Sequence, residues 1–244
     1  MPIYLHKLVL LLLLGISSSA FSLDPLKIEI RTIGFPPYGI LNDRVASGIY
    51  YDLANKLAAA VGLDASNTVA PYTRIRSGLK SGRADLSIMF KYSELNDYVV
   101  YVAPLPTLKT VVVGLKGSSF DSIQSLENKR IAYLRGGSFS EQIDNNPNIQ
   151  KYRTTNFLQG VKMLLGGRVD AIIGPMEPIL AAAAKSNLSN DLFGTPFVVA
   201  ERTPWIQISK KGALVPYVEL LREEFALIQA RGDLELLRRQ YTQN

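Results

Sequence analysis

The sequence has 244 residues, with 27 lysines and arginines against 21 aspartates and glutamates, which gives a formal net charge of +6. It contains no cysteine, and its only histidine, His6, lies in an N-terminal stretch that we expect to be removed. The remaining chain therefore cannot form a disulfide, a Ser-His-Asp triad, a thiolate nucleophile or an ordinary zinc site. The charges are interspersed, so no nucleic-acid partner is expected, and neither a cofactor nor a metal is predicted.

Residues 1–22 have the layout of a secretory signal peptide. Lys7 supplies a positive charge, residues 8–14 form an apolar run, and small residues precede a cleavage point after Ala20 or Ser22. The apolar run is shorter than the ~20 residues that a membrane-spanning helix needs. Since no cysteine is present to carry a lipid, we expect an exported periplasmic protein that is not a lipoprotein.

Alternating apolar and polar residues predict a strand over Lys27–Ile33. Apolar residues at four-residue spacing predict a helix over Gly48–Val61, which Gly62 is placed to end. Strands that alternate with helices indicate an α/β architecture with mainly parallel sheets. The same patterns predict further strands over 86–90, 110–115, 130–134, 169–173 and 205–209, and helices over 74–80, 157–165, 178–185, 217–230 and 234–241.

One four-residue pattern occurs twice. Gly82–Asp85 follows a predicted helix and precedes a predicted strand, and Gly167–Asp170 has the same context. In both, the glycine can supply a left-handed turn after the helix, and the polar residues lead into the strand. This repetition favours two similar lobes.

Several motifs, taken in order, resemble those of the family 3 periplasmic solute-binding proteins, the receptors of polar amino-acid ABC transporters. The resemblance extends over nearly the whole chain after the signal peptide. The closing helices fit as well. The motifs are Ile33–Tyr38, Gly48–Ala54, Gly78–Asp85, Ser125–Gly137 and Leu164–Ile173.

The resemblance implies a two-lobed periplasmic-binding-protein fold of type II, each lobe being a mainly parallel sheet flanked by helices. Lobe one would contain residues 23–105 and 201–244, and lobe two residues 106–200. The segments Ala103–Leu108 and Val198–Thr203 would form the hinge. A ligand would bind between the lobes of a monomer and hold them closed.

Three aromatic residues are candidates for the ligand site. Phe35 and Tyr38 lie on a proline-rich loop just after the first strand, where the family places an aromatic ring on the ligand. Tyr51 lies in the first turn of the following helix. The alternative is structural, because the loop rings would also cap the edge of the sheet and Tyr51 would also fit the core.

The segment 136–140, Gly-Gly-Ser-Phe-Ser, follows the strand over 130–134 and begins a predicted helix. Free backbone N–H groups and hydroxyls at such a position attract anions. The resemblance implies that Ser138, Phe139 and Ser140 help to hold the ligand's carboxylate. A serine there would also serve as a helix N-cap, and the two roles are compatible.

The resemblance fails at the charged residues of the ligand site. Family members that bind α-amino acids carry an arginine after the third strand, but the segment Ser93–Tyr98 contains none. Lys91, Tyr92 and Arg74 are candidate substitutes, and Glu177 is a candidate for the carboxylate that receives an ammonium group. For each of the charged residues, a solvated surface position is the alternative.

These observations predict a protein that captures a small polar or anionic, amino-acid-like ligand for an ABC permease or a membrane sensor. No catalytic residue is assigned. One alternative is an enzyme on the same fold, similar to cyclohexadienyl dehydratases, with Glu177 as the acid. A second alternative is a regulatory partner that binds another protein's periplasmic domain and has a degenerate cleft.

Overall fold

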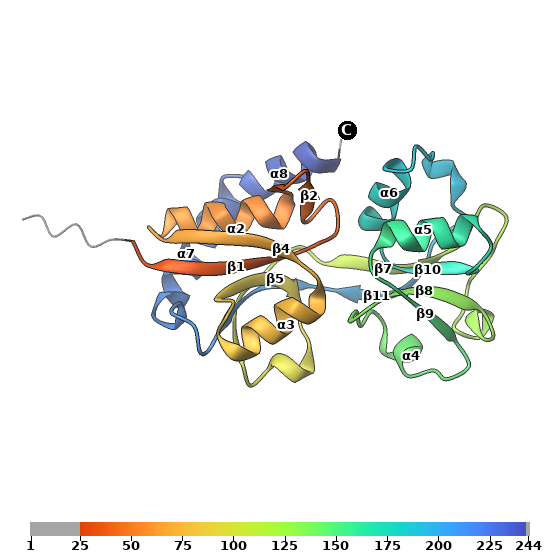
Figure 1. Ribbon diagram of the computed structural model, residues 1–244, viewed down its shortest axis with the longest axis horizontal. Helices are drawn as coiled ribbons and strands as arrows, with labels where there is room; N and C mark the ends of the chain where they lie inside the picture. Colours follow the sequence, from red (N-terminus) through yellow and green to blue (C-terminus); the bar gives the residue numbers. More distant parts are fainter. Residues whose placement is uncertain (1–24, 243–244) are drawn as a thin grey trace, which may run out of the picture.

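The computed structural model describes residues 25–242 and shows two lobes, each built around a five-stranded sheet flanked by helices (Figure 1). The predicted signal peptide, residues 1–22, lies outside the described residues. We call the lobe that contains the first strand lobe one and the other lobe two.

In lobe one, the strands are, in spatial order, β4 (Asp64–Ala70), β1 (Lys27–Ile33), β5 (Leu86–Phe90), β12 (Pro204–Ser209) and β6 (Val99–Pro104). Strand β12 runs against the direction of the other strands. The helices are α2 (Ile49–Ala60), α3 (Tyr72–Ser81), α7 (Val218–Ala230), α8 (Asp233–Thr242) and the short η1 (Ser93–Leu95) and η4 (Val215–Tyr217). Helices α2, α7 and α8 lie on one side of the sheet and α3 on the other (Figure 1).

Lobe two repeats this arrangement, with β7 as the reversed strand. In spatial order its strands are β11 (Phe197–Arg202), β7 (Leu108–Val113), β10 (Ala171–Pro175), β8 (Arg130–Leu134) and β9 (Gln150–Thr154). Its helices are α4 (Glu141–Asp144), α5 (Phe157–Leu165), α6 (Met176–Ala184), η2 (Gln124–Leu126) and η3 (Asn190–Leu192). A small hairpin of β2 (Ile40–Asn42) and β3 (Val45–Ser47) belongs to lobe one.

The predicted architecture of two lobes with mainly parallel sheets is confirmed, and the predicted helices lie where the periodicity places them. Strands β2, β3, β6 and β11 were not predicted as strands, and neither were β4 and β9. Strands β4 and β9 lie at a sheet edge and have few apolar residues, so neither shows the apolar run of a buried strand. Strand β11 overlaps the predicted hinge segment Val198–Thr203 and pairs with β7 there.

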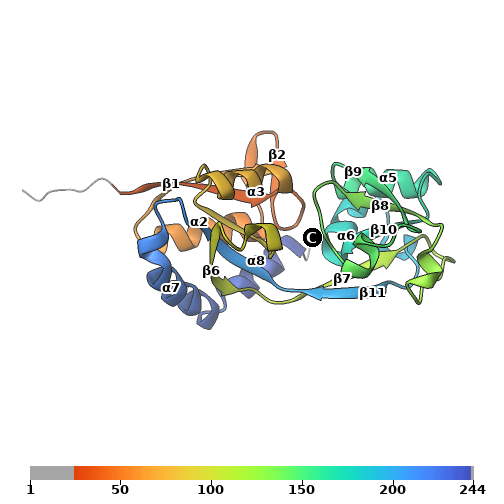
Figure 2. The same ribbon diagram turned by 90° about the horizontal axis from the view of Figure 1, so that it is seen from below.

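The chain passes between the lobes twice, and the two crossings lie side by side (Figure 2). Residues 105–107 connect β6 to β7, and Thr203 alone separates β11 from β12. The hydroxyl oxygens of Thr107 and Thr203 are 2.7 Å apart, which joins the two crossings. The domain boundaries given above and the hinge function of these segments remain predictions.

The repeated Gly-Arg-x-Asp pattern occupies equivalent positions in the two lobes. The Asp85 carboxylate accepts a hydrogen bond from the backbone N–H of Glu29 on β1 at 2.8 Å, and the Asp85 N–H donates to the Glu29 carbonyl at 2.7 Å. Asp170 makes the same pair of bonds with the backbone of Arg130 on β8, at 2.8 and 2.7 Å. Each aspartate therefore joins the start of its own strand, β5 or β10, to the neighbouring strand, β1 or β8, through two hydrogen bonds.

Replacing Asp170 with asparagine is expected to make the free energy of unfolding depend less on pH in the acidic range. The Arg130 guanidinium donates two further bonds to Asp170 and holds the pKa of its carboxyl below the ordinary 3.8. A depressed carboxyl pKa contributes stability above pH 3.8 that is lost as the pH falls below it. Urea unfolding at several acidic pH values should therefore show that the free energy of unfolding falls less steeply with decreasing pH in Asp170→Asn than in the wild type. The exposed Asp64 provides the control, Asp64→Asn, and equal slopes in the two variants would contradict this expectation.

Candidate functional site

Aromatic rings from both lobes fill the space between them. Phe35 of lobe one lies 5.4 Å from Phe157 of lobe two, measured between ring centroids, with the rings nearly perpendicular. Phe35 also lies 5.7 Å from Tyr72, and Tyr38 stacks on Tyr50 at 4.4 Å. All five side chains are buried. These rings therefore form a continuous contact across the junction, and we call this group the aromatic cluster.

The aromatic cluster leaves little free volume. The cavity within it measures about 10 Å³, which is room for roughly one water molecule. A solute of amino-acid size does not fit there, so its entry requires the lobes to separate or the rings to move. The cavity is lined by Ile33, Phe35, Tyr38, Tyr50, Tyr72, Met89, Phe90, Leu108, Pro175 and Pro204.

Two larger cavities flank the cluster, and each is lined by both lobes. The first has about 200 Å³ and includes Phe35 and Phe157 together with polar groups of Asn42, Asn156 and Lys185. The second has about 320 Å³ and is lined by Pro37, Glu177, Leu180, Ala181, Ala184, Tyr241 and Thr242. The predicted residue Glu177 thus lies at the edge of the junction, where its carboxylate is 3.7 Å from the Arg238 guanidinium of lobe one.

The loop 34–39 holds Phe35 and Tyr38 in the junction. The Tyr38 carbonyl accepts hydrogen bonds from the N–H groups of Tyr50 at 2.9 Å and Tyr51 at 3.3 Å, which fixes the loop to the start of α2. Of these two tyrosines, Tyr50 stacks on Tyr38. Tyr51, the residue predicted for the site, is half-buried and lines none of the three cavities. Helical geometry separates neighbouring residues by a large angle, so only one of the two can face the cluster.

Three buried polar atoms at the junction have no hydrogen-bond partner among residues 25–242: the hydroxyls of Tyr38 and Tyr92 and the Nε of Arg76. Leaving such a group unpaired costs about 1–3 kcal/mol. Burial raises the pKa of Tyr38, and the nearby Glu177 carboxylate raises it further, although the two groups lack hydrogen-bond geometry. Burial also raises the pKa of Tyr92. Both hydroxyls are therefore protonated at neutral pH and can donate to a ligand or to water.

Lys91 does not point into the cavities between the lobes. Its ammonium lies 3.7 Å from the centroid of the Trp205 ring and 4.3 Å from that of Tyr101, within lobe one. Such contacts between a cation and an aromatic face stabilise the side chain where it is. The backbone carbonyl of Lys91, in contrast, accepts a hydrogen bond from Arg202 at 2.8 Å. Lys91 therefore contributes its backbone to the junction, and its charge lies elsewhere.

Tyr92, which was predicted for the site, lies close to two arginines. The guanidinium carbon of Arg76 is 4.9 Å from the centroid of the Tyr92 ring, and that of Arg202 is 5.6 Å from it. The centroid of the Tyr72 ring lies 5.7 Å from that of Tyr92. The structure therefore brings Tyr92 into contact with the aromatic cluster and with two positive charges.

The segment 136–140 does not form a free helix N-terminus. Helix α4 spans only Glu141–Asp144, and the Ser138 hydroxyl donates to the Asp144 carboxylate at 2.7 Å. Ser140 is buried, and its hydroxyl lies 3.5 Å from the Val199 carbonyl. Phe139 packs on Tyr133 in the core of lobe two and lines none of the three cavities. Among these three predicted residues, only Ser138 has an observed contact toward the junction, through its carbonyl to Arg202.

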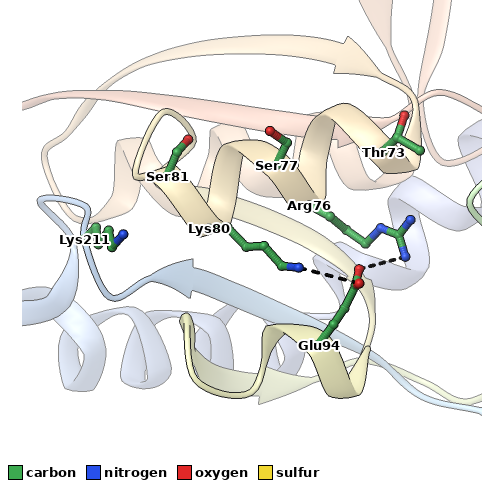
Figure 3. A pocket seen from close by; sticks show the side chains of 7 residues that line it. All are labelled: Thr73, Arg76, Ser77, Lys80, Ser81, Glu94 and Lys211. Carbon is green, nitrogen blue, oxygen red and sulfur yellow. Dashed lines mark ion pairs between the residues drawn. The ribbon is translucent and has the colours of Figure 1, made fainter.

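The arginine of α3 that reaches Tyr92 is Arg76, whereas the predicted Arg74 is exposed. Residues 72, 76 and 80 share one face of a helix, so the spacing from Tyr72 is the signal that identifies Arg76. Arg76 pairs with Glu94 at 2.9 Å, and Lys80 approaches the same carboxylate at 3.5 Å (Figure 3). These residues also line an open surface groove of about 470 Å³ on lobe one, which contains none of the predicted site residues.

Four further residues of the junction were missed by sequence reasoning: Tyr50, Tyr72, Phe157 and Arg202. Phe157 carried a recognisable signal, because it opens α5 directly after Asn156, whose side chain caps the helix by accepting from the Gln159 N–H at 2.8 Å. The others gave no local signal that separates a junction residue from a core or surface residue. Within residues 25–242, no group of three or more His, Cys, Asp or Glu side chains is arranged to hold a metal ion.

No family model matches the sequence, and no curated protein matches it. Solved structures match the fold. A mutant of ArgBP from T. maritima has a TM-score of 0.76 and 19% identity, over 89% of this chain and 96% of that one. An ancestral arginine-binding protein bound to arginine has a TM-score of 0.74 and 21% identity, over 88% and 97% of the two chains. An amino acid ABC transporter substrate-binding protein from Streptococcus pneumoniae bound to L-arginine has a TM-score of 0.75 and 17% identity, over 89% and 94%. The predicted two-lobed periplasmic-binding-protein fold is therefore confirmed.

Proposed function

We propose that this chain is a periplasmic solute-binding protein that captures a small polar or anionic, amino-acid-like molecule between its lobes. Its fold matches proteins whose names describe arginine-binding and ABC transporter substrate-binding proteins. The capture would serve an ABC permease or a membrane sensor, and the protein would act as a monomer exported by residues 1–22. No helix within residues 25–242 has the length and apolarity to cross a membrane.

The observation that supports the proposal most strongly is the set of unpaired polar atoms at the junction. The hydroxyls of Tyr38 and Tyr92 belong to side chains that are only 3% and 6% exposed, and neither has a partner among the described residues. Tyr38 lines the central cavity, and Tyr92 contacts Tyr72, whose ring lines the same cavity. A bound solute would supply the missing hydrogen bonds, and the closed form would then bind it better than the open form.

Contacts between the lobes hold them together at the junction. They include the Phe35–Phe157 ring pair, the Arg238–Glu177 ion pair, a bond of 3.4 Å from Lys185 to the Asn42 side chain, and a bond of 2.8 Å from Arg202 to the Lys91 carbonyl. A ligand has to compensate for those contacts that it displaces. We infer that ligand entry involves opening at the crossings near residues 105–107 and Thr203.

The dehydratase alternative requires a buried acid at Glu177. Its side chain is 35% exposed and pairs with Arg238, so its surroundings resemble a surface ion pair. The structures that match the fold carry names of binding proteins. No observation favours the alternative of a regulatory partner over solute capture.

A thermal-shift screen tests the proposal. The purified protein is heated in the presence of the common amino acids, their N-acyl derivatives, dicarboxylic acids and peptidoglycan fragments. At least one class is expected to raise the melting temperature, because a ligand at 100 times its Kd stabilises the folded state by about 2.7 kcal/mol. Titration calorimetry then gives the affinity. A screen without any shift would contradict solute capture and favour the regulatory alternative.

A further inference from the structure

The Arg202 guanidinium contacts both lobes. It ends β11, directly before the second crossing. Its guanidinium donates one hydrogen bond to the Ser138 carbonyl of lobe two and another, of 2.8 Å, to the Lys91 carbonyl of lobe one. It also lies over the rings of Phe90 and Tyr92, at 4.7 and 5.6 Å from their centroids. The side chain is thus fixed at the junction by neutral groups.

None of the ion pairs found among residues 25–242 includes Arg202. A guanidinium carries five N–H donors in a planar fork that matches a carboxylate. A carboxylate can accept two parallel bonds from this fork and also balances its charge, which a neutral carbonyl cannot do. The two carbonyls accept only two of the N–H groups of Arg202, and no carboxylate of the described residues pairs with it.

The groups around Arg202 favour an anion with an apolar body. The Tyr92 hydroxyl, which has no partner among the described residues, is available as a second donor. Arg76 lies on the same ring and adds positive charge, although it is paired with Glu94. Arg202 lies over the Phe90 ring, and Phe90 lines the central cavity together with other carbon-rich side chains, among them Phe35, Met89, Leu108, Pro175 and Pro204.

We propose that Arg202 and the Tyr92 hydroxyl form the anion subsite of the cleft, and that the ligand is a carboxylate with an aromatic or aliphatic body. This inference rests on the proposed function and specifies its ligand class. When the lobes open, the ligand carboxylate replaces the Ser138 and Lys91 carbonyls as the acceptor of the guanidinium. The apolar body of the ligand displaces ring contacts of the aromatic cluster. The two carbonyls position the guanidinium at the junction.

The experiment uses sodium benzoate as the probe, benzamide as its uncharged analogue, and inorganic phosphate as an anion without an apolar body. Binding is followed in the isotope-labelled protein through the Nε–Hε signal of Arg202, which is assigned by its absence from Arg202→Gln. Benzoate is expected to shift this signal in a saturable manner and to raise the melting temperature. Benzamide and phosphate are expected to do so at least tenfold less effectively, because benzamide lacks the negative charge and phosphate lacks the apolar body.

Arg202→Gln is expected to weaken benzoate binding at least tenfold, and Arg202→Lys to weaken it less, because lysine keeps the charge and loses the fork. Arg222→Gln is the matched control: Arg222 also donates to a backbone carbonyl, that of Val102 at 3.0 Å, but it lies on α7 and is paired with Glu219. This control is expected to bind benzoate as the wild type does. Folding of each variant is checked by its amide spectrum, and Arg202→Lys keeps the test valid if Arg202→Gln does not fold.

The outcomes separate this inference from the proposed function. If a solute from the thermal-shift screen binds the wild type and Arg202→Gln with equal affinity, solute capture stands and the anion subsite is overturned. If benzoate shifts the Arg202 signal but no solute of the screen raises the melting temperature, the anion subsite stands and capture of an amino-acid-like ligand is overturned. Equal binding of phosphate and benzoate would overturn the assignment of an apolar carboxylate.

Discussion

Gly48→Ala is expected to lower the free energy of unfolding by about 3 kcal/mol or more. Gly48 precedes α2 with a φ of +123°, in a region that side chains rarely adopt, and a Cβ there would lie 2.7 Å from the Tyr38 carbonyl oxygen. That carbonyl is backbone and accepts the bonds that fix the loop to α2, so it cannot move away cheaply. Urea unfolding measures the effect.

Gly62→Ala is the matched control for this prediction. Gly62 also has a positive φ, +72°, but no atom lies within 4 Å of the place where its Cβ would be. We expect a loss of only about 1–2 kcal/mol, from backbone strain alone. Equal losses in the two variants would show that the close approach to the Tyr38 loop has no energetic role. A larger loss for Gly48→Ala, together with weaker ligand binding, would show that this glycine positions the Tyr38 ring.

Phe157→Ala is expected to open the lobes in the absence of a ligand. Phe157 is 4% exposed and makes the ring contact with Phe35 across the junction. Loss of the buried apolar surface of Phe157 and of its ring pair destabilises the closed form by about 2 kcal/mol or more. This shifts the equilibrium between closed and open forms about thirtyfold toward the open form. Small-angle X-ray scattering should therefore report a larger radius of gyration than for the wild type.

Phe225→Ala separates this effect from a general loss of stability. Phe225 is 1% exposed and lies on α7, within the core of lobe one. Its removal is expected to cost about 3–5 kcal/mol of stability without changing the radius of gyration of the folded protein. If Phe157→Ala keeps the wild-type radius, the aromatic cluster does not hold the lobes together.

The helices and central strands of this protein follow from local patterns in the sequence. Ile49, Leu53 and Leu57 repeat at the helical period, and all three are buried along one face of α2. The two Gly-Arg-x-Asp segments also predicted the similar lobes, because each aspartate makes the same pair of backbone bonds at its strand. Such features depend on residues close together in the chain, so the chain order alone is enough to predict them.

Edge strands and site side chains needed information from distant segments. Strand β9 is polar and becomes a strand only because β8 pairs with it. The Lys91 ammonium lies over the ring of Trp205, which is more than a hundred residues later in the chain. No local pattern could show this, because a side chain's direction depends on the partners that the fold brings near it.

The sequence by itself determined that the chain forms two similar α/β lobes and that residues 25–242 contain no histidine or cysteine, and it predicted that Phe35, Tyr38 and Tyr92 lie near a ligand site. Only the tertiary structure decided that Arg202, and not Lys91, brings an uncompensated charge to the junction. The physical reason is that periodic burial is a local property of a segment. The electrostatic environment of a residue, in contrast, is set by groups that only folding brings together.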